Sequence, residues 1–211
     1  MRKQMYKNLM IDIETLDTAP ENKAVIVSVG MVKFNLLDED TWETIESEPT
    51  RCGYWVLPIE PQLKAGRTIG PSTLLWWINQ IRTGHPDAAE IFSPRAQHWD
   101  LESNEFRNVS HDLLLKLNEM DTFADDGGLY AWAKPAHFDL PKMESLFGTY
   151  KMTFPIPWYM YKCMAGVKAA AAVLEVPRPK FKTKGNVQHH ALWDAKAQVL
   201  ELQGWFHNMR R

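Results

Sequence analysis

The sequence predicts an α/β fold in which a mixed β-sheet is flanked by α-helices. The first third of the chain contains short apolar segments rich in β-branched residues, which are typical of strands. The remainder consists mainly of segments whose apolar residues recur at helical spacing, interrupted by one short apolar run at 128–133. Strands, helices, a further strand and more helices, in that order, are satisfied by a sheet with helices packed on its faces.

Four segments are predicted to be strands. Residues 8–14 form a short apolar run that ends in acidic residues, and residues 24–34 are rich in valine and isoleucine. Residues 42–56 offer a third strand, although the polar residues around Pro49 blur its limits. The sequence GLYAWA at 128–133 predicts a fourth strand, which we expect to be buried.

Five segments are predicted to be helices. Pro71 suits the first position of a helix that continues to residue 81, and Asn108 or Ser110 can cap a helix whose apolar residues lie between 113 and 120. The other helical segments are 140–147, the alanine-rich 161–174 and the amphipathic 190–209. Residues 86–105 are interpreted as an insertion or loop with one short helical piece.

A length of 211 residues indicates one domain over residues 1–211, and the 45% of hydrophobic residues can form a full core without disulfides. Cys52 and Cys163 have no zinc-binding spacing and fit a reducing cytosol. The sequence shows no apolar stretch that is long and uninterrupted enough for a signal peptide or a membrane span. We therefore expect a cytoplasmic protein with no membrane partner. A net charge of −2 excludes coating of nucleic acid through bulk charge, but not a local nucleic-acid site.

Asp12 and Glu14 stand two residues apart at the end of the first predicted strand. Side chains two apart in a strand point to the same face, so the two carboxylates are expected to lie together. Neighbouring carboxylates repel each other, and a divalent cation such as Mg²⁺ or Mn²⁺ removes that conflict. Alone, the pair is a weak signal, because Asp-x-Glu also occurs on exposed strands that bind nothing.

Two further acidic positions follow later in the chain. Asp139 comes after the predicted strand at 128–133 and opens a helix, where it can serve as an N-cap, as a metal ligand or as both. Asp194 lies near the start of the last predicted helix, and His189 lies five residues earlier, at the turn that enters it. The alternative for this last pair is a solvated helix start with an incidental histidine.

Taken in order, these motifs resemble those of the DEDDh branch of the DnaQ-like 3′–5′ exonucleases, whose fold is similar to that of ribonuclease H. Asp-x-Glu-Thr matches residues 12–15, a motif ending in Phe-Asp matches 138–139, and His-x-Ala-x-x-Asp-Ala matches 189–195. The tryptophan-containing segment 73–80 and the segment 129–132 also resemble the phage exonuclease A and bacterial exoribonuclease group. Lys-Pro-Ala at 134–136 departs from relatives that carry asparagine or glycine there.

The resemblance implies two divalent metal ions, Mg²⁺ or Mn²⁺. One would be bound between Asp12, Glu14 and Asp194, and the other by Asp12, partly through water, with Asp139 nearby. His189 would act as general base toward the attacking water. The products would be nucleoside 5′-monophosphates released from a single-stranded 3′ end, and a phage origin would place the enzyme in the host cytoplasm.

His190 competes with His189 for the role of base, and the spacing of the motif favours His189, with His190 beginning the helix. The resemblance further implies that Ile13, Thr15 and Leu16 contact the terminal nucleotide, with Leu16 as an apolar wedge beside the base. Simple packing of the turn is the alternative for these residues. His137 is interpreted as a pocket wall or as a partner of the helix start.

Trp76 and Trp77 are adjacent in a predicted helix, so they cannot face the same direction. We predict that Trp77 stacks on a base, while either tryptophan can instead belong to the core. A basic row precedes His189 and consists of Arg178, Lys180, Lys182 and Lys184. In an extended segment these side chains share a face and can meet backbone phosphates, although a solvated charged loop is the interpretation we favour.

Three functions remain open from the sequence. An active exonuclease is favoured because all four carboxylates and the histidine are present. The alternatives are a catalytically silent module that binds strand ends or proteins, and a metal-dependent enzyme that acts on short oligomers only. The sequence does not decide between DNA and RNA, and it leaves the oligomeric state, including a homodimer, undetermined.

Overall fold

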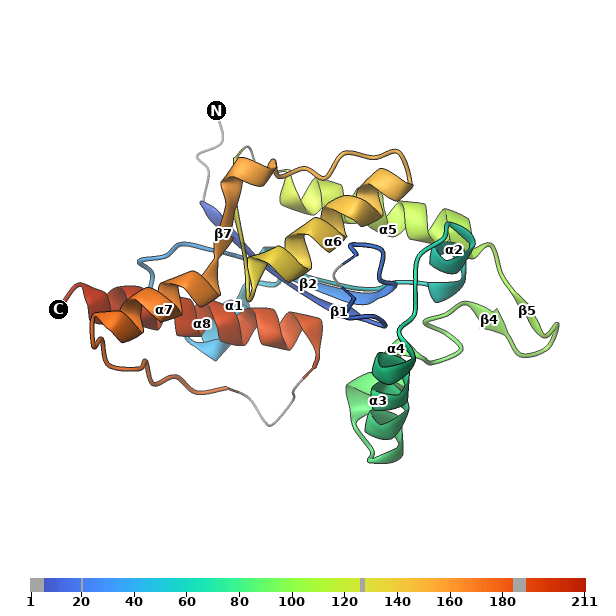
Figure 1. Cartoon of the computed structure of the whole chain (residues 1–211), viewed down its shortest axis with the longest axis horizontal. Helices are drawn as coiled ribbons and strands as arrows, with labels where there is room; N and C mark the ends of the chain where they lie inside the picture. The colour runs from blue at the N-terminus through green and yellow to red at the C-terminus, as the bar shows by residue number, and fades with distance from the viewer. Residues whose placement is uncertain (1–5, 20, 126–127, 184–188) are drawn as a thin grey trace.

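The computed structural model describes residues 6–19, 21–125, 128–183 and 189–211. Its centre is a five-stranded mixed sheet with the strand order β3-β2-β1-β6-β7 (Figure 1). The first three strands pair antiparallel, whereas β1, β6 and β7 run parallel. The strands are β1 (Asn8–Thr15), β2 (Ile26–Phe34), β3 (Cys52–Val56), β6 (Tyr130–Ala133) and β7 (Tyr161–Cys163). Helices cover the sheet on both faces, which confirms the predicted fold class.

Alternation along β1 divides the core into two layers. Leu9, Ile11 and Ile13 pack on one face of the sheet with α5 (Val109–Ala124) and α6 (Ala136–Thr149). Met10 points to the other face and packs with α8 (Ala191–Met209), together with α1 (Trp42–Ser47) and α7 (Met164–Val173). Because side chains two apart share a face, the even-numbered residues at the end of β1 face α8. This alternation brings the acidic end of β1 close to the start of the last helix.

The prediction of one strand over 42–56 is wrong in its first half. Residues Trp42–Ser47 form helix α1, which is followed by a 3₁₀ turn, η1 (Pro49–Arg51), and only then by β3. The helix begins because Thr41 and Thr44 form a capping box, in which each side chain binds the other's backbone N–H. Local capping therefore outweighs the β-propensity of the segment.

The alanine-rich segment 161–174 also differs from its prediction. Its first residues form strand β7, which pairs parallel with β6, and helix α7 begins only at Met164 and ends at Val173. Three residues are too few to show the periodicity of a strand, so the sequence assigned them to the helix that the following alanines indicate. The predicted helices at 71–81, 113–120, 140–147 and 190–209 correspond to α3 (Pro71–Arg82), α5, α6 and α8.

Helix α3 (Pro71–Arg82) and helix α4 (Pro86–Ile91) stand beside the sheet rather than on it (Figure 1). Trp77 attaches this pair of helices to the body, because it packs in a buried cluster with Leu16, Val25 and Val27. The remaining elements are α2 (Ile59–Lys64), η2 (Trp158–Met160) and a small hairpin of β4 (Trp99–Asp100) and β5 (Glu105–Phe106). No helix in the described ranges combines the length and apolar character needed to cross a bilayer.

Candidate active site

Three carboxylates meet where β1 ends and α8 begins. Asp12 and Glu14 come from β1 and Asp194 from the first turn of α8, and one oxygen of each lies within 4.8 Å of the others. All three side chains are partly exposed, so the cluster is open to solvent on one side. These are the residues that the sequence placed together, and their oxygens are spaced closely enough to share one cation.

A close contact between strand and helix explains why Asp194 reaches the sheet. Gly30 lies in strand β2, next to β1, and pairs there with Asp12 of β1. A Cβ atom on Gly30 would lie 2.3 Å from backbone atoms of both Ala191 and Leu192, so only glycine allows α8 to begin against the sheet. Farther along α8, the Gln198 amide donates a 2.6 Å hydrogen bond to Oδ1 of Asp12 and fixes that carboxylate. Nothing in the local sequence around Gly30 or Gln198 indicated these roles.

Asp139 completes the set of acids from the opposite face. It lies in the first turn of α6, whose N-cap is Pro135, so the expectation that Asp139 caps this helix is wrong. Its side chain is only 4% exposed, and among the described residues its Oδ2 has no hydrogen-bond partner. Asp139 is not among the carboxylates that lie within 4.8 Å of one another. A buried, unpaired carboxylate oxygen is costly, and a cation would satisfy it.

Burial and mutual repulsion disfavour the charged form of the clustered carboxylates. Burial raises the pKa of Asp139 to about 7, although backbone N–H groups of Ile13 and of Asp139 itself oppose the shift. Burial also raises the pKa of Asp12 well above its ordinary value, and the charges of Asp139, Glu14 and Asp194 add to the effect. The protein alone therefore does not balance the negative charge that it gathers here, which is the condition that a bound divalent cation would relieve.

The two adjacent histidines have different surroundings. His190 is the N-cap of α8: its Nδ1 accepts a hydrogen bond from the Trp193 N–H, and its buried ring stacks on Tyr54 with 4.4 Å between centroids. His189 is exposed, and its Nδ1 lies 3.9 Å from an oxygen of Glu14. The His189 backbone N–H donates a 2.9 Å hydrogen bond to Asp194. His190 is thus occupied by its structural role, and His189 is the histidine beside the carboxylates.

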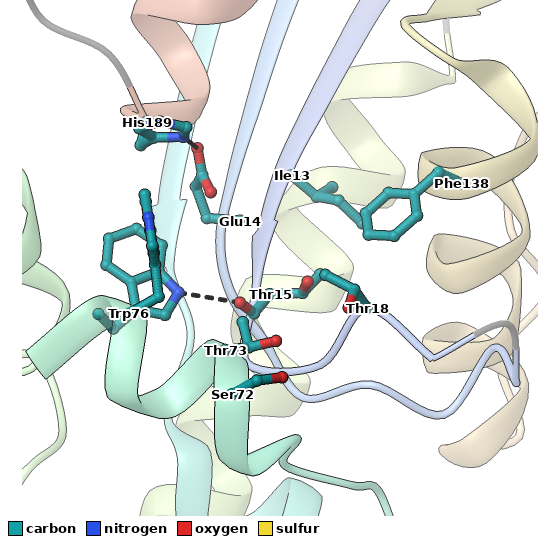
Figure 2. Close-up of a pocket in the computed structure, with 10 residues that line it drawn as sticks. Ile13, Glu14, Thr15, Thr18, Ser72, Thr73, Trp76, Phe138 and His189 are labelled. Atoms are coloured by element: carbon teal, nitrogen blue, oxygen red, sulfur yellow. Dashed lines mark hydrogen bonds and ion pairs between the residues drawn. The ribbon is translucent and has the colours of Figure 1, made fainter.

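A pocket opens beside the carboxylates, between α3, the end of β1 and the start of α6 (Figure 2). Trp76 and Phe138 form aromatic parts of its wall, and the rings of Trp76 and His189 make a T-shaped contact with 4.6 Å between centroids. Ile13, Thr15 and Trp77, three of the predicted substrate contacts, also line it. The sequence analysis gave no substrate role to four other lining residues, which are Thr18, Ser72, Thr73 and Phe138.

Three predicted substrate contacts do not agree with the structure. Trp77 is among the pocket-lining residues, but it is only 1% exposed and its indole N–H donates to the Thr15 carbonyl, so stacking of a base on its ring does not agree with its burial. Leu16 is also 1% exposed and packs in the same cluster as Trp77, so it is not a wedge. His137 is exposed at the second position of α6 and does not line the pocket.

Trp76 and Trp77 differ in exposure because adjacent residues on a helix point in different directions. Successive side chains on a helix point about 100° apart, so burial of Trp77 turns Trp76 toward the pocket, where it remains 37% exposed. The sequence indicated that only one of the two could face the pocket, but it did not indicate which. Phe138 was visible as part of the Phe-Asp motif, and its position directly before Asp139 was the signal that could have identified it.

The basic row is only partly within the described residues. Arg178, Lys180 and Lys182 are exposed, whereas Lys184 lies outside the described ranges. Pro179 packs against α8 at Gly204, and Lys180 lines a groove beside the far end of that helix rather than the pocket at the carboxylates. Contact between this row and a nucleic-acid backbone therefore stays a prediction.

Comparison with known proteins adds one finding to this geometry. No curated protein matches the chain. A family model described as the 3′-5′ exoribonuclease Rv2179c-like domain matches residues 7–204. That range begins just before β1 and includes the four carboxylates, His189 and most of α8. Since the match covers nearly the whole chain, the protein belongs to the Rv2179c-like family of 3′–5′ exoribonuclease domains.

Proposed function

We propose that the chain removes nucleotides one at a time from the 3′ end of single-stranded RNA, releasing nucleoside 5′-monophosphates with the help of two divalent metal ions. The observation that carries this proposal is the acidic cluster of Asp12, Glu14 and Asp194, with their oxygens within 4.8 Å of one another. Membership of a 3′–5′ exoribonuclease family supplies the direction of attack and the polymer. DNA remains the alternative substrate, and the test below includes it.

The donor set fits Mg²⁺ or Mn²⁺, because both are hard cations that prefer carboxylate oxygens. Asp12, Glu14 and Asp194 would hold one ion, and Asp12 with Asp139 would hold the other. The unpaired buried Oδ2 of Asp139 supports the second assignment, because a cation would supply the missing partner. When bound, the ions supply stabilisation of the attacking and leaving oxygens of an in-line displacement.

The pocket suits the terminal nucleotide. Trp76 and Phe138 present aromatic surface within reach of the carboxylates, and Figure 2 shows them approaching the pocket from different elements, α3 and α6. Base–aromatic stacking contributes about 1–3 kcal/mol per base and tolerates any base. A nucleotide held there would place its 5′-phosphate toward Asp12 and Glu14, because those residues end the strand that borders the pocket.

His189 is proposed as the general base that takes a proton from the attacking water while the bond between phosphorus and O3′ of the preceding nucleotide breaks. Burial lowers its pKa below the ordinary histidine value, although Asp194 opposes the shift, so the ring is neutral near pH 7 and can accept a proton. We expect His189→Ala to slow single-turnover cleavage by about 10²–10⁴-fold, the usual contribution of general acid–base catalysis.

His137→Ala is the matched control for this prediction, because it removes an exposed histidine that does not line the pocket. It should cleave at the wild-type rate. Metal-induced thermal stabilisation should persist in His189→Ala, since the four carboxylates remain. A His189→Ala rate within threefold of wild type would assign the base to another group.

The proposed function is tested with single-stranded RNA and DNA of equal sequence, each labelled at the 5′ end. Wild type, Asp194→Ala and Asp121→Ala are incubated with Mg²⁺, Mn²⁺ or a chelator. We expect a ladder that shortens from the 3′ end, faster on RNA, and lost with chelator or with Asp194→Ala. Asp121→Ala is the control, because it removes an acid on α5 outside the pocket and should cleave normally.

Each alternative function gives a different result in this assay. Absence of a ladder on both polymers, with both metals and over short and long substrates, would reject the exonuclease and favour a silent binding module. Cleavage confined to substrates of a few nucleotides would instead favour an enzyme of short oligomers.

A further inference from the structure

One wall of the pocket consists of hydroxyl side chains. Ser72 and Thr73 come from the first turn of α3, and Thr18 comes from the loop after β1 (Figure 2). Within the described residues, none of these three hydroxyls makes a hydrogen bond. The neighbouring Thr15 differs, because its hydroxyl donates to the Asp17 carbonyl at 2.9 Å. Three polar groups of the pocket therefore keep their hydrogen-bonding capacity for a ligand.

These hydroxyls lie beside the aromatic wall. Ser72 and Thr73 precede Trp76 by four and three residues on α3, and residues at those spacings share one face of a helix. A base stacked on Trp76 would thus place its attached sugar next to the α3 hydroxyls, and Thr18 lines the same pocket from the loop after β1. The carboxylates that would hold the phosphate are reached from the same pocket through Glu14.

The chemistry of this wall fits a sugar better than a phosphate. Among the residues that line the pocket, only Glu14 and His189 can carry charge, so the side chains of the hydroxyl wall are uncharged. A serine or threonine hydroxyl both donates and accepts, and it rotates to suit its partner. The ribose 2′-hydroxyl has the same double capacity, and it is the group by which a protein distinguishes RNA from DNA.

We propose that Ser72, Thr73 and Thr18 bind the ribose of the 3′-terminal nucleotide and select for its 2′-hydroxyl. This inference rests on the proposed function, because it places the terminal nucleotide in the same pocket. It goes beyond that function by assigning sugar selection to hydroxyls of α3 and of the loop after β1, separately from the carboxylates and from His189.

The test uses RNA oligonucleotides that are identical except for the last sugar, which is ribose, 2′-deoxyribose or 2′-O-methylribose. Release of the last nucleotide is measured as kcat/KM. We expect wild type to favour ribose over deoxyribose by about fivefold to tenfold, the effect of one to two hydrogen bonds. In the double variant Ser72→Ala/Thr73→Val, this ratio should fall to about two or less, because the deoxy substrate has no 2′-hydroxyl to lose.

Two further variants separate hydroxyl chemistry from packing. Ser72→Thr/Thr73→Ser keeps both hydroxyls and should retain the wild-type ratio. Ser110→Ala removes an exposed serine from the second position of α5, the position that Ser72 occupies in α3, and should leave ratio and rate unchanged.

The outcomes are distinguishable. Active variants that keep the full ribose preference after loss of both α3 hydroxyls would overturn the inference and leave the exonuclease intact. A preference that follows the terminal base instead of its sugar would also overturn it and would assign the hydroxyls to a base edge. If wild type released no nucleotide from any substrate, the proposed function would fall, and this inference with it.

Discussion

Replacing Asp12 with asparagine is expected to abolish cleavage and, in the absence of metal, to make the protein more stable. Asp12 is the central acid, because its pKa is raised by burial and then by the charges of Asp139, Glu14 and Asp194. Asparagine has nearly the same shape, and its carbonyl oxygen can still accept the hydrogen bond from Gln198. The substitution therefore removes repulsion while preserving packing, and we expect a gain of about 1 kcal/mol or more in unfolding free energy.

The same substitution should remove much of the stabilisation that metal gives to wild type. A ligand that binds only the folded state stabilises it in proportion to its affinity, and Asp12 is the acid that we assign to both ions. Thermal melts with chelator, Mg²⁺ and Mn²⁺ would measure this, beside the cleavage assay. An Asp12→Asn protein that is less stable than wild type in chelator would show that repulsion between the acids is not a significant cost.

The pH dependence of the same melts provides the control. Because the folded-state pKa of Asp139 is about 7 and its ordinary value is 3.8, the folded protein holds a proton there that the unfolded chain has released. The contribution of Asp139 to the unfolding free energy in chelator should therefore be highest below pH 3.8 and fall as the pH rises from 3.8 toward 7. The decrease is at most about 1.4 kcal/mol per pH unit for one proton. In Asp12→Asn, the unfolding free energy should fall less steeply with rising pH than in wild type.

Parts of the fold and site whose signals lie within one element could be predicted from the sequence. Asp12 and Glu14 share a face because strand side chains alternate, and that inference needs no knowledge of neighbouring elements. Asp194 and His189 lie together because a few residues at a helix start form one local unit. The motif order then indicated that these units come together, and the structure places them at the end of β1, the central strand of the sheet.

What could not be predicted depends on contacts between distant segments. Trp76 and Trp77 have the same local signal, and only the cluster that buries Trp77 against Leu16 decides that Trp76 is the one with an exposed ring at the pocket. His137 looked equivalent to other residues beside Asp139, but the direction of α6 leaves it in solvent. Gln198 carried no motif at all, and its role follows only from the way α8 crosses the end of β1.

The junction between β2 and α8 is a feature of this kind, and it positions the site without touching substrate. Gly30 lies opposite Asp12 in the sheet, and the backbone of Ala191 and Leu192 occupies the space where a side chain would be. Backbone atoms 2.3 Å from an added Cβ cannot yield as the tip of a flexible side chain can. Any larger residue must therefore push the start of α8, and with it Asp194, away from the sheet.

Gly30→Ala is accordingly expected to destabilise the protein by about 1–3 kcal/mol, the usual cost of overpacking a filled core, and to slow cleavage beyond what the lost stability explains. Gly166→Ala is the matched control: Gly166 lies inside α7 with nothing within 4 Å of its added Cβ, so alanine should stabilise that helix by about 0.5–1 kcal/mol.

Both variants would be compared by thermal unfolding and by cleavage at a temperature where each is fully folded. Displacement of Asp194 predicts that Gly30→Ala also needs more Mg²⁺ for half-maximal activity, whereas a purely structural loss would leave that requirement unchanged. Full activity and unchanged stability in Gly30→Ala would mean that the approach of α8 to β2 does not position Asp194.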